Sequence, residues 1–335
     1  MALIRMDGFD HHRIGSAHAD DTDRYKFDTS SGYWVQGLQD DTLRTGARVL
    51  NLLAADRLVH WYWLSLSEIY MGLAIRSDHE SQQPDISISN STAVQVHFDI
   101  QADGSLIIYR GTGGTQLWDS VDTIFPQADW NYWEFNVVLS DTVGVVHVKK
   151  NGVTVINLTS QDTLLSGNET ITAVHMRGAM YIDDFWIDDA QFHGPCRIET
   201  LWPDGDGNYS QMAPSAGDNY ECVDDSLMWN TSDYVTGDAA DERDTFTFES
   251  IPALSGSAIK GIAVNNIAQK TDVNTVKIKN TVRVNGSDYD DSVEKELETT
   301  YRIFQTIWDD NPDDAAAWEE ADINAMEAGA FISTI

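Results

Sequence analysis

Short runs of alternating apolar and polar residues, separated by glycine-containing turns, recur through the first 190 residues. Two pairs of such runs flank a turn signal: 93–100 and 105–109 around Asp103-Gly104, and 143–149 and 153–157 around Asn151-Gly152. A period of two is the pattern of a half-buried strand, and both dipeptides favour the positive φ angles of tight hairpin turns. No alternation of strands with helices is visible, so we expect antiparallel sheets.

The run 130–139 shows how one strand of such a sheet is built. Alternation divides its side chains between two faces, with Tyr132, Glu134 and Asn136 on one and Trp133, Phe135 and Val137 on the other. The segment 43–58 fits a helix, although its part 48–53 fits a strand equally well. Many short antiparallel strands with one apolar face each indicate two packed sheets, an all-β sandwich.

A boundary between two domains is expected near His193-Gly194-Pro195. A chain of 335 residues has room for two domains at roughly 100–200 residues each. All nine histidines lie at or before His193, whereas residues 194–335 carry 28 acidic and only 9 basic side chains. Glycine and proline also interrupt the strand pattern there. We therefore expect one domain over 1–193 and another over 194–335.

The second half also alternates, which predicts a smaller β domain. The alternating segments are 257–265, 274–284 and 298–308, and Asn285-Gly286 supplies a turn signal. One short helix is expected over 315–328, with Asp313 or Asp314 as its cap and Gly329 at its end. The tail 330–335 resembles a strand that pairs either within its own domain or with the edge of a neighbouring subunit.

The charge of the chain excludes several classes of partner. Its formal net charge is −33, and its longest run of basic residues is Lys149-Lys150. A protein that binds nucleic acid needs a cationic face to displace counterions, so no nucleic-acid partner is expected. No apolar run approaches the ~20 residues of a membrane helix, so no membrane insertion is expected. The start lacks a signal peptide's apolar stretch, and we expect Cys196 and Cys222 to be free thiols.

Catalytic motifs are missing from the sequence. His79-Glu80 is not followed by the second histidine of a zinc protease helix, and no nucleophile elbow is present. The glycine-rich stretch 111–114 has no lysine and no helix after it, as a phosphate-binding loop would require. We therefore expect a protein that is not an enzyme.

The late part of the first half resembles concanavalin A-like, or laminin-G-like, jelly rolls. Three segments occur in the order typical of that family: Trp130–Phe135 with its "W…E" pattern, Gly144–Gly152 ending in "NG", and Tyr181–Asp189 with its "IDD" pattern. The resemblance implies a jelly-roll sandwich in which the first strand of the chain lies beside 181–189. It says little about function, because this fold carries many functions.

In modules of this kind, sugar rings stack on aromatic side chains and calcium often binds near the closing strand. The tryptophans that would hold a glycan are Trp34, Trp61, Trp63 and Trp118, although Trp61 and Trp63 share one strand face and fit the core equally well. The residues that would hold a structural calcium ion are Asp183, Asp184, Asp188 and Asp189. Alternation places Asp183 and Asp189 on the side of Phe185. Alternatively, the aspartates hold loop N–H groups or face water.

Residues 181–325 are similar to structural proteins of tailed bacteriophages. Six pieces follow one another in the order of that family: the "DD" strand, Gly194–Pro203, Pro214–Asp225, Asp233–Val235, Asp244–Phe246, and Asn311–Ala325. Asp313-Asp314, Glu319 and Asp225 depart from the family's usual residues, which changes the local contact surface.

This resemblance implies a virion structural protein, assembled in the host cytoplasm, that is associated with the tail or a fibre. Its partners would be other virion proteins, further copies of itself in a homo-oligomer such as a trimer, and a host-surface glycan. A capsid-decoration protein is the alternative within this class. A free carbohydrate-binding lectin or a polysaccharide depolymerase is the alternative of another class.

Overall fold

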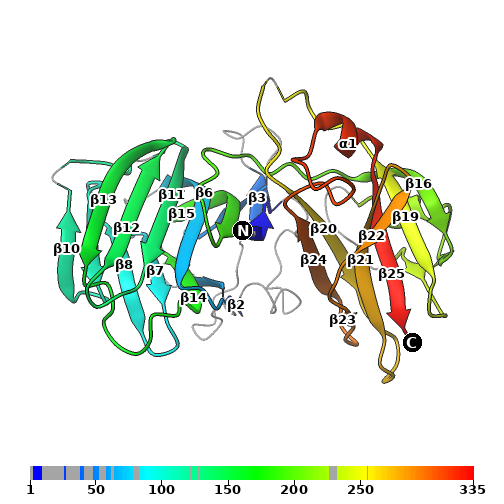
Figure 1. Cartoon of the computed structure of the whole chain (residues 1–335), viewed down its shortest axis with the longest axis horizontal. Coiled ribbons are helices and arrows are strands. Elements are labelled where there is room, and N and C mark those ends of the chain that lie inside the picture. The colour runs from blue at the N-terminus through cyan, green and yellow to red at the C-terminus, as the bar shows by residue number, and fades with distance from the viewer. Residues whose placement is uncertain are drawn as a thin grey trace. The chain divides into compact units, whose positions relative to one another are not determined.

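The chain divides into two compact units, Met1–Ile198 and Glu199–Ile335, which are drawn in Figure 1. The computed structural model describes residues 3–9, 26–27, 38–40, 48–52, 58–61, 64–77, 83–120, 122–126, 128–225, 232–254 and 256–335. At 26–27, 38–40, 48, 51 and 58–61 it describes the backbone alone. The division between the units lies shortly after the boundary expected at His193.

The described part of unit 1 consists of strands and their connections. Its strands are β1 (Leu3–Asp7), β2 (Lys26–Phe27), β3 (Leu38–Asp40), β4 (Arg48–Asn51), β5 (Leu58–Trp61), β6 (Glu68–Ser77), β7 (Asp85–Ser89), β8 (Val94–Ile100), β9 (Leu106–Arg110), β10 (Thr115–Asp119), β11 (Asn131–Val138), β12 (Gly144–Lys150), β13 (Val153–Gln161), β14 (Ala173–Arg177) and β15 (Met180–Asp188).

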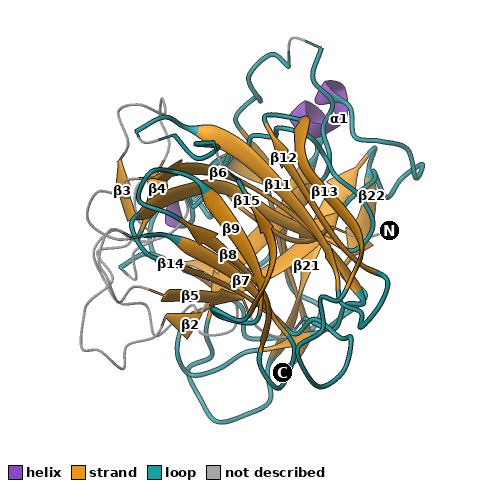
Figure 2. Cartoon of the chain, turned by 90° about the vertical axis from the view of Figure 1, so that its left-hand side faces the viewer, coloured by secondary structure: helices purple, strands orange, loops and turns teal. Residues whose placement is uncertain are grey.

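These strands form two antiparallel sheets that pack face to face as a jelly-roll sandwich (Figure 2). Sheet A has the order β13-β12-β11-β6-β15-β4-β3, with β1 also paired to β15. Sheet B has the order β10-β9-β8-β7-β14-β5-β2. Met6 of β1 pairs with Trp186 of β15, so the first strand lies beside the closing strand as the family resemblance implies. The predicted all-β class with an N-terminal jelly roll is confirmed.

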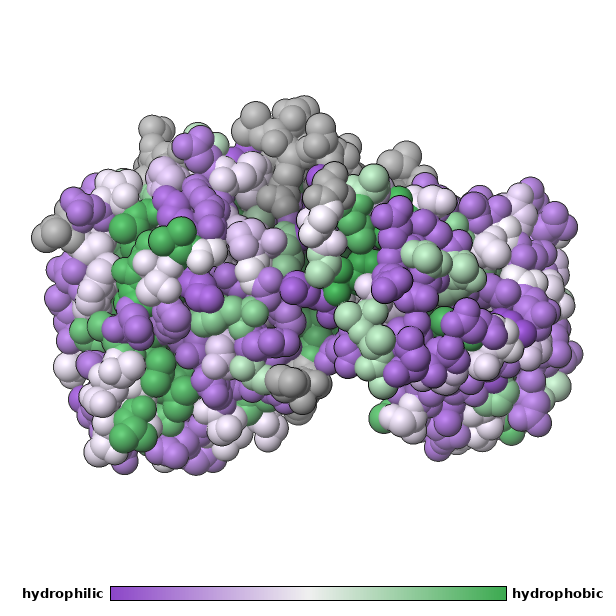
Figure 3. All heavy atoms as spheres, turned by 45° about the horizontal axis from the view of Figure 1, so that its top comes forward, coloured by the Kyte–Doolittle hydropathy of each residue, from purple (hydrophilic) through white to green (hydrophobic). Residues whose placement is uncertain are grey.

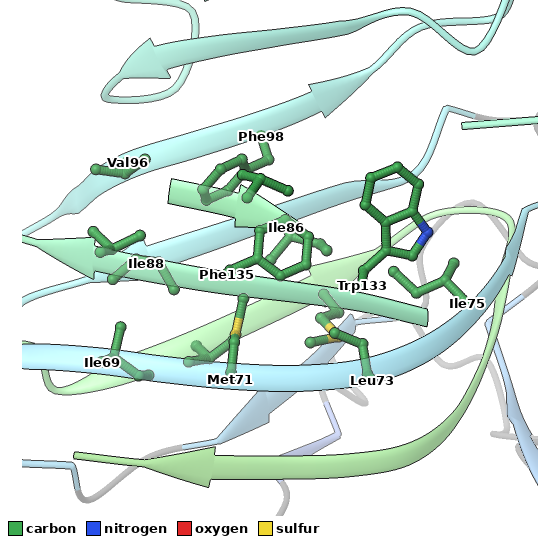
Figure 4. Packing of buried hydrophobic residues seen from close by; sticks show 14 of the residues in the cluster. Ile69, Met71, Leu73, Ile75, Ile86, Ile88, Val96, Phe98, Trp133 and Phe135 are labelled. Carbon is green, nitrogen blue, oxygen red and sulfur yellow. The ribbon is translucent and has the colours of Figure 1, made fainter. Parts of the chain in front are cut away.

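Apolar side chains at alternate positions fill the space between the two sheets. On β11, Trp133, Phe135 and Val137 are buried in the core, as the alternation predicts. Phe135 meets Phe98 of β8 edge to face at 5.1 Å between ring centroids, and Figure 4 shows both rings among aliphatic side chains. Such burial stabilises each large apolar side chain by about 1.5–3 kcal/mol and leaves the outward-facing positions for other roles.

The hairpin turns agree with the sequence in part. Asn151 and Gly152 have φ of +49° and +80°, the left-handed pair that a two-residue hairpin requires. At the other predicted turn only Gly104 has a positive φ, +78°, and β8 and β9 are joined by the longer loop 101–105. The ambiguous segment 48–53 contains strand β4.

Unit 2 is also a β structure. Its strands are β16 (Pro203–Ser210), β17 (Ala213–Pro214), β18 (Val235–Thr236), β19 (Arg243–Phe248), β20 (Ile262–Ala268), β21 (Lys277–Val284), β22 (Ser287–Asp290), β23 (Lys295–Glu296), β24 (Arg302–Trp308) and β25 (Glu327–Thr334), accompanied by a 3-10 turn (Tyr220–Cys222) and helix α1 (Glu320–Ala325).

One antiparallel sheet of unit 2 has the order β16-β19-β25-β21-β22, with β23 on β21, and β20 and β24 form a separate two-stranded ribbon. Buried Asn280 of β21 joins the two: its Nδ2 donates to the carbonyls of Val264 (2.7 Å) and Phe304 (2.8 Å) in the ribbon. Its Oδ1 accepts a hydrogen bond from Asn266 at 3.0 Å. A buried asparagine with its bonds satisfied holds the ribbon in one register against the sheet.

The helix of unit 2 is shorter than the sequence predicts. Helix α1 begins after Glu319 and not after Asp313 or Asp314, because Ala315 has a φ of +57° and Asp310 pairs with Ala317 in a bridge. Gly329 does not end the helix, because it lies within β25. The tail is a strand as predicted: it belongs to β25, which lies between β19 and β21 and so pairs within its own unit, one of the two alternatives. No helix in the described ranges is long and apolar enough to cross a membrane.

Candidate functional site

The tryptophans expected to bind a glycan are not gathered at one place in the described structure. Trp34 and Trp63 lie outside the described residues, and Trp61 ends β5 with only its backbone described. Trp118 of β10 is half-buried and packs against the core between the sheets. The indole of Trp118 thus contributes to packing on the inner side of sheet B.

The aspartates of the closing strand hold the last segment of unit 1 on the outer face of sheet A. Asp188 Oδ1 accepts hydrogen bonds from the backbone N–H groups of Ala190 (2.6 Å) and Gln191 (3.0 Å), and Oδ2 lies 3.0 Å from His193 Nε2. Asp184 Oδ1 accepts one from Ile198 N at 2.8 Å. This is the alternative that the sequence left open, in which the aspartates bind loop N–H groups.

Further contacts seat the same segment, 190–198, which we call the closing segment. Glu134 Oε1 of β11 accepts a hydrogen bond from Gly194 N at 2.7 Å. The ring of Phe192 meets those of Tyr70 and His147 edge to face, each at 5.0 Å between centroids. Backbone and side chains of the closing segment therefore occupy the polar outer positions of β15, β11, β6 and β12.

A bulge in β15 changes which aspartates share a face. Asp184 has a φ of +50°, and the register shifts between Asp183, which pairs with Ala74, and Trp186, which pairs with Gly72. The extra residue moves Asp183 to the outer face that Trp186 and Asp188 occupy. The expectation that Asp183 shares the side of Phe185 is therefore wrong, because simple alternation does not include a bulge.

The aspartates do not form a cage for a cation. In the part of the chain that the structure describes, no group of three or more His, Cys, Asp or Glu side chains is placed to hold a metal ion. Asp183, Asp184 and Asp188 are buried, whereas Asp189 is exposed. Burial acts to raise the pKa of Asp188, but the hydrogen bonds from His193, Ala190 and Gln191 outweigh it and hold that pKa below its usual value.

The outer face of sheet B carries a different arrangement, in which polar side chains contact one another. Strand pairing aligns a row across five strands, which we call the histidine row: His175 (β14), Ser87 (β7), His97 (β8), Tyr109 (β9) and Gln116 (β10). A second row, the acidic row, runs beside it: Arg177, Asp85, Asp99, Ile107 and Asp119. Figure 2 shows β14, β7, β8 and β9 side by side in this sheet.

Within each row, side chains of neighbouring strands contact one another. Ser87 Oγ lies 2.9 Å from His97 Nδ1, and the His97 ring is stacked against Tyr109 at 6.4 Å between centroids. In the acidic row, Arg177 Nε donates to Asp85 Oδ2 at 2.8 Å, and Nη2 lies 2.7 Å from the same oxygen. Neighbouring strands lie about 4.8 Å apart, so each row presents one side chain per strand at that spacing.

The rows have a buried floor and a more exposed rim. Ser87, His97 and Asp85 are less than 8% exposed, whereas Tyr109, Asp99 and His175 are half-buried and Arg177 is exposed. Burial lowers the pKa of His97 despite the neighbouring carboxylates of Asp85 and Asp99, and burial raises the pKa of Asp85 against the influence of Arg177. The imidazole is therefore favoured in its neutral form, which both donates and accepts hydrogen bonds.

The sequence contained a signal for this face that aromatic content alone does not reveal. In 85–89 and 95–99 a polar side chain stands at every second position, opposite the isoleucines, valine and phenylalanine of the core. Pairing the predicted strands 93–100 and 105–109 as a hairpin sets His97 against Tyr109. Histidine, hydroxyl and carboxylate side chains supply this signal, whereas the glycan site expected from the sequence consisted of tryptophans.

No protein-family model matches the chain, and no curated protein sequence matches it. Among solved structures, galectin LEC-6 of Caenorhabditis elegans is similar over 38% of this chain and 89% of its own, with 13% identity and a TM-score of 0.31. The homodimeric agglutinin CG-16 from chicken liver is similar over 39% and 99%, with 16% identity and a TM-score of 0.29. An alginate lyase Aly36B mutant, in complex with an alginate trisaccharide, is similar over 46% and 88%, with 12% identity and a TM-score of 0.31. Likenesses this distant carry no argument, and the jelly-roll assignment rests on the strand orders.

Proposed function

We propose that unit 1 is a carbohydrate-binding module whose site is the outer face of sheet B, and that it binds without catalysis. The observation that carries the proposal is the histidine row, in which the hydroxyl of Ser87, the imidazole of His97 and the phenol of Tyr109 are aligned over three adjacent strands. A sugar offers hydroxyls on its edge and C–H groups on its face. Polar groups placed beside an aromatic ring match both surfaces.

The acidic row adds selectivity by charge. Asp85, Asp99 and Asp119 stand against a single cation, Arg177, whose guanidinium is already paired with Asp85. A carboxylated or sulfated glycan would bring further negative charge to this face, in a chain of net charge −33. The site therefore favours uncharged or amino sugars over polyanionic ones.

The test is binding of the full chain to an array of neutral, amino, carboxylated and sulfated glycans. Tyr109→Ala should lower the affinity for the best neutral glycan about 10-fold, which corresponds to about 1.4 kcal/mol. Tyr234→Ala is the matched control, because Tyr234 is 47% exposed in unit 2, and it should bind like the wild type. Failure of the wild type to bind any glycan, or equal loss in both variants, contradicts the proposal.

The absence of catalysis needs its own measurement. The full chain is incubated with each bound polysaccharide, and new reducing ends and new unsaturated ends are measured. We expect neither to form beyond the level of a buffer blank. Release of either kind of end that disappears in Tyr109→Ala would overturn a purely binding role and support the depolymerase alternative.

For the whole chain we propose a virion structural role, associated with the tail or a fibre, in which unit 1 adheres to host glycans. The support is the resemblance of residues 181–325 to tailed-phage structural proteins, together with the site on unit 1. An array of weak sites on one particle gains avidity, so a modest affinity per site suffices. Under this proposal, other virion proteins and further copies of this chain are the partners.

Copy number in purified particles tests this role. Quantitative mass spectrometry would compare the chain with the major capsid protein of the same particles. A ratio far below one supports the tail or fibre position, and a ratio near one supports capsid decoration. A chain missing from the particles contradicts the virion role and favours a free lectin.

A further inference from the structure

A loop covers one end of the outer face of sheet B, beside the histidine row. It is the first part of the connection between β13 and β14, residues 162–168, which we call the wall loop. Gln95 of β8 is 0% exposed and binds this loop. Val96 points into the core, so Gln95 and His97 on either side of it share the outer face. The wall loop therefore lies next to His97 along β8, at a spacing of two residues, or about 7 Å.

Two buried amides hold the wall loop in place. Gln95 Oε1 accepts hydrogen bonds from the backbone N–H groups of Leu165 (2.7 Å) and Ser166 (3.1 Å). Asn90, which is 5% exposed, donates through Nδ2 to the backbone carbonyls of Ser166 (2.6 Å) and Asn168 (2.8 Å). Because these N–H groups are already paired, Leu165 offers a ligand its side chain and not its N–H.

The side chain of Leu165 lies over the residue that follows β9. Gly111 continues the ladder between β8 and β9, since its N–H donates to the carbonyl of Gln95 at 2.8 Å. A Cβ at Gly111 would lie 2.7 Å from Leu165 Cδ2, so the absence of a side chain there leaves room for the leucine. Leu165 is thereby placed one outward position along from Tyr109, with the tyrosine half-buried and the leucine 48% exposed.

Exposure of an apolar side chain does not by itself mark a site. On the face shown in Figure 3, unit 1 presents apolar side chains among hydrophilic ones, whereas most side chains of unit 2 are hydrophilic. Val143, Val153 and Val155 are exposed as well, but they belong to β13 or to the turn before β12, in sheet A. Leu165 differs from them because buried polar side chains hold it beside the histidine row.

We infer that Leu165 is the apolar wall of the glycan site and selects a sugar that carries a methyl group on that side of its ring. The inference rests on the proposed function, because it assigns a contact within the same site. A methyl group placed against the leucine leaves water favourably. A hydroxyl placed there would lose its hydrogen bonds to water and gain none from the N–H groups of the loop, which are already paired.

The opposite side of the site has a different chemistry. Asp99 follows His97 by two residues, so the acidic row lies about 7 Å from the histidine row on the side away from Leu165. Carboxylates accept hydrogen bonds from hydroxyl groups. A sugar ring beside Tyr109 therefore has one preferred orientation, with its methyl-bearing substituent toward Leu165 and its hydroxyls toward the acidic row.

The test compares sugars that differ in one methyl-bearing substituent. An N-acetyl group and the terminal carbon of a 6-deoxy sugar both supply a methyl group, so the full chain is titrated with cellotriose, chitotriose and 6-deoxycellotriose, and with the corresponding galactose series. We expect one of the methyl-bearing forms to bind about 4-fold more tightly than its parent, the gain from burial of one methyl group. Leu165→Ala should reduce that ratio to about 1.

Two further variants separate loss of the apolar contact from a general disturbance of the protein. Val143→Ala truncates a side chain that is 65% exposed in the turn before β12, and it should keep the wild-type ratio. Leu165→Met has a similar volume and should keep most of the preference. The identity of the preferred form, N-acetylated or 6-deoxy, shows which source of the methyl group the wall accepts.

The outcomes distinguish this inference from the proposed function. If the wild type binds these glycans and Tyr109→Ala weakens binding, the site stands. The inference then fails if the wild type shows no preference for a methyl-bearing form, if Leu165→Ala keeps the preference, or if Val143→Ala loses it equally. A wild type that binds other glycans but neither series also overturns the inference. A wild type that binds no glycan overturns the proposed function, and this inference with it.

Discussion

The two outer faces of the sandwich carry similar residues but use them differently. On sheet A, the carboxylates of Asp188, Asp184 and Glu134 accept hydrogen bonds from backbone N–H groups of the closing segment. On sheet B, the side chains of Ser87 and His97 contact each other, and strand pairing aligns them with Tyr109. A polar group occupied by the backbone supports the fold, whereas the buried Ser87–His97 pair orients an imidazole beside the half-buried ring of Tyr109, which is the part of the row that a ligand can reach.

The largest effect is expected from removal of the Asp188 carboxylate. In Asp188→Ala the N–H groups of Ala190 and Gln191 and the ring of His193 lose a buried carboxylate as their acceptor. Loss of three hydrogen bonds to a charged group costs about 3 kcal/mol in the free energy of unfolding. Chemical denaturation of the full chain, followed by tryptophan fluorescence, measures the loss, and glycan binding of the folded variant should be unchanged.

Asp189→Ala is the control for that measurement, because Asp189 is the exposed neighbour in sequence. It should change the free energy of unfolding by less than about 0.5 kcal/mol. Equal losses in the two variants would mean that the hydrogen bonds to the closing segment contribute little. A loss of glycan binding in Asp188→Ala would mean that the faces are not separate in function.

The matching change on sheet B is Ser87→Ala, and its effect should appear mainly in binding. The variant leaves His97 Nδ1 without its partner in a buried position, at a cost of about 1 kcal/mol in stability. The imidazole then loses its orientation, and we expect the affinity for a neutral glycan to fall about 5-fold, measured by calorimetry. Ser89→Ala, one outward position along β7, leaves the His97 contact intact and should keep wild-type affinity.

Much of the fold could be predicted from the sequence because alternation and turn residues act locally. Asn151-Gly152 determines its hairpin by backbone conformation alone, and the alternation of β11 divides its side chains as expected. The helix bounds could not be predicted in the same way. The left-handed Ala315 and the bridge from Asp310 to Ala317 depend on contacts within unit 2, and the residues after α1 join the centre of a sheet.

The candidate site was harder to predict because the sequence does not show what covers an outward-facing side chain. Asp188 and His97 both occupy outward-facing positions on their strands. Asp188 nevertheless binds the closing segment, whereas His97 belongs to the histidine row. The bulge at Asp184 also moved Asp183 across β15. Trp118 fitted stacking on a sugar by residue type, but the edge of sheet B directs it to the core.

Changing the pH should separate two carboxylates on the same face of sheet A. The pKa of Asp188 is lowered in the fold, so its contribution to stability is present above its unfolded value, about 3.9, and is lost as the pH falls through the lower folded value. Burial raises the pKa of Glu134, so its ionisation costs stability near pH 7 and that cost disappears as the pH falls through the folded value.

Two isosteric variants measure these opposite signs. Near pH 7, Glu134→Gln should have a higher free energy of unfolding than the wild type. This difference should shrink as the pH is lowered from 7 to about 4, because the wild-type carboxyl becomes protonated over that range. Asp188→Asn should have a lower free energy of unfolding than the wild type at neutral pH. Part of this difference should disappear only in stronger acid, where the wild-type carboxylate becomes protonated. Unfolding curves at several pH values give both differences, and identical pH trends in the two variants would contradict the assigned pKa directions.

The smallest expected effect concerns charge selectivity on sheet B. Asp99 is half-buried in the acidic row, where its charge opposes a carboxylated ligand. Asp99→Asn should raise the affinity for a uronate-containing oligosaccharide about 2-fold relative to a neutral one of equal length, since exposed charge pairs contribute about 0.5 kcal/mol. Asp141→Asn removes the same charge from an exposed turn and should leave that ratio unchanged. The difference should vanish at 1 M salt, where the screening length is about 3 Å. If the ratio rises equally in both variants, net charge alone accounts for selectivity, and the acidic row has no specific part in it.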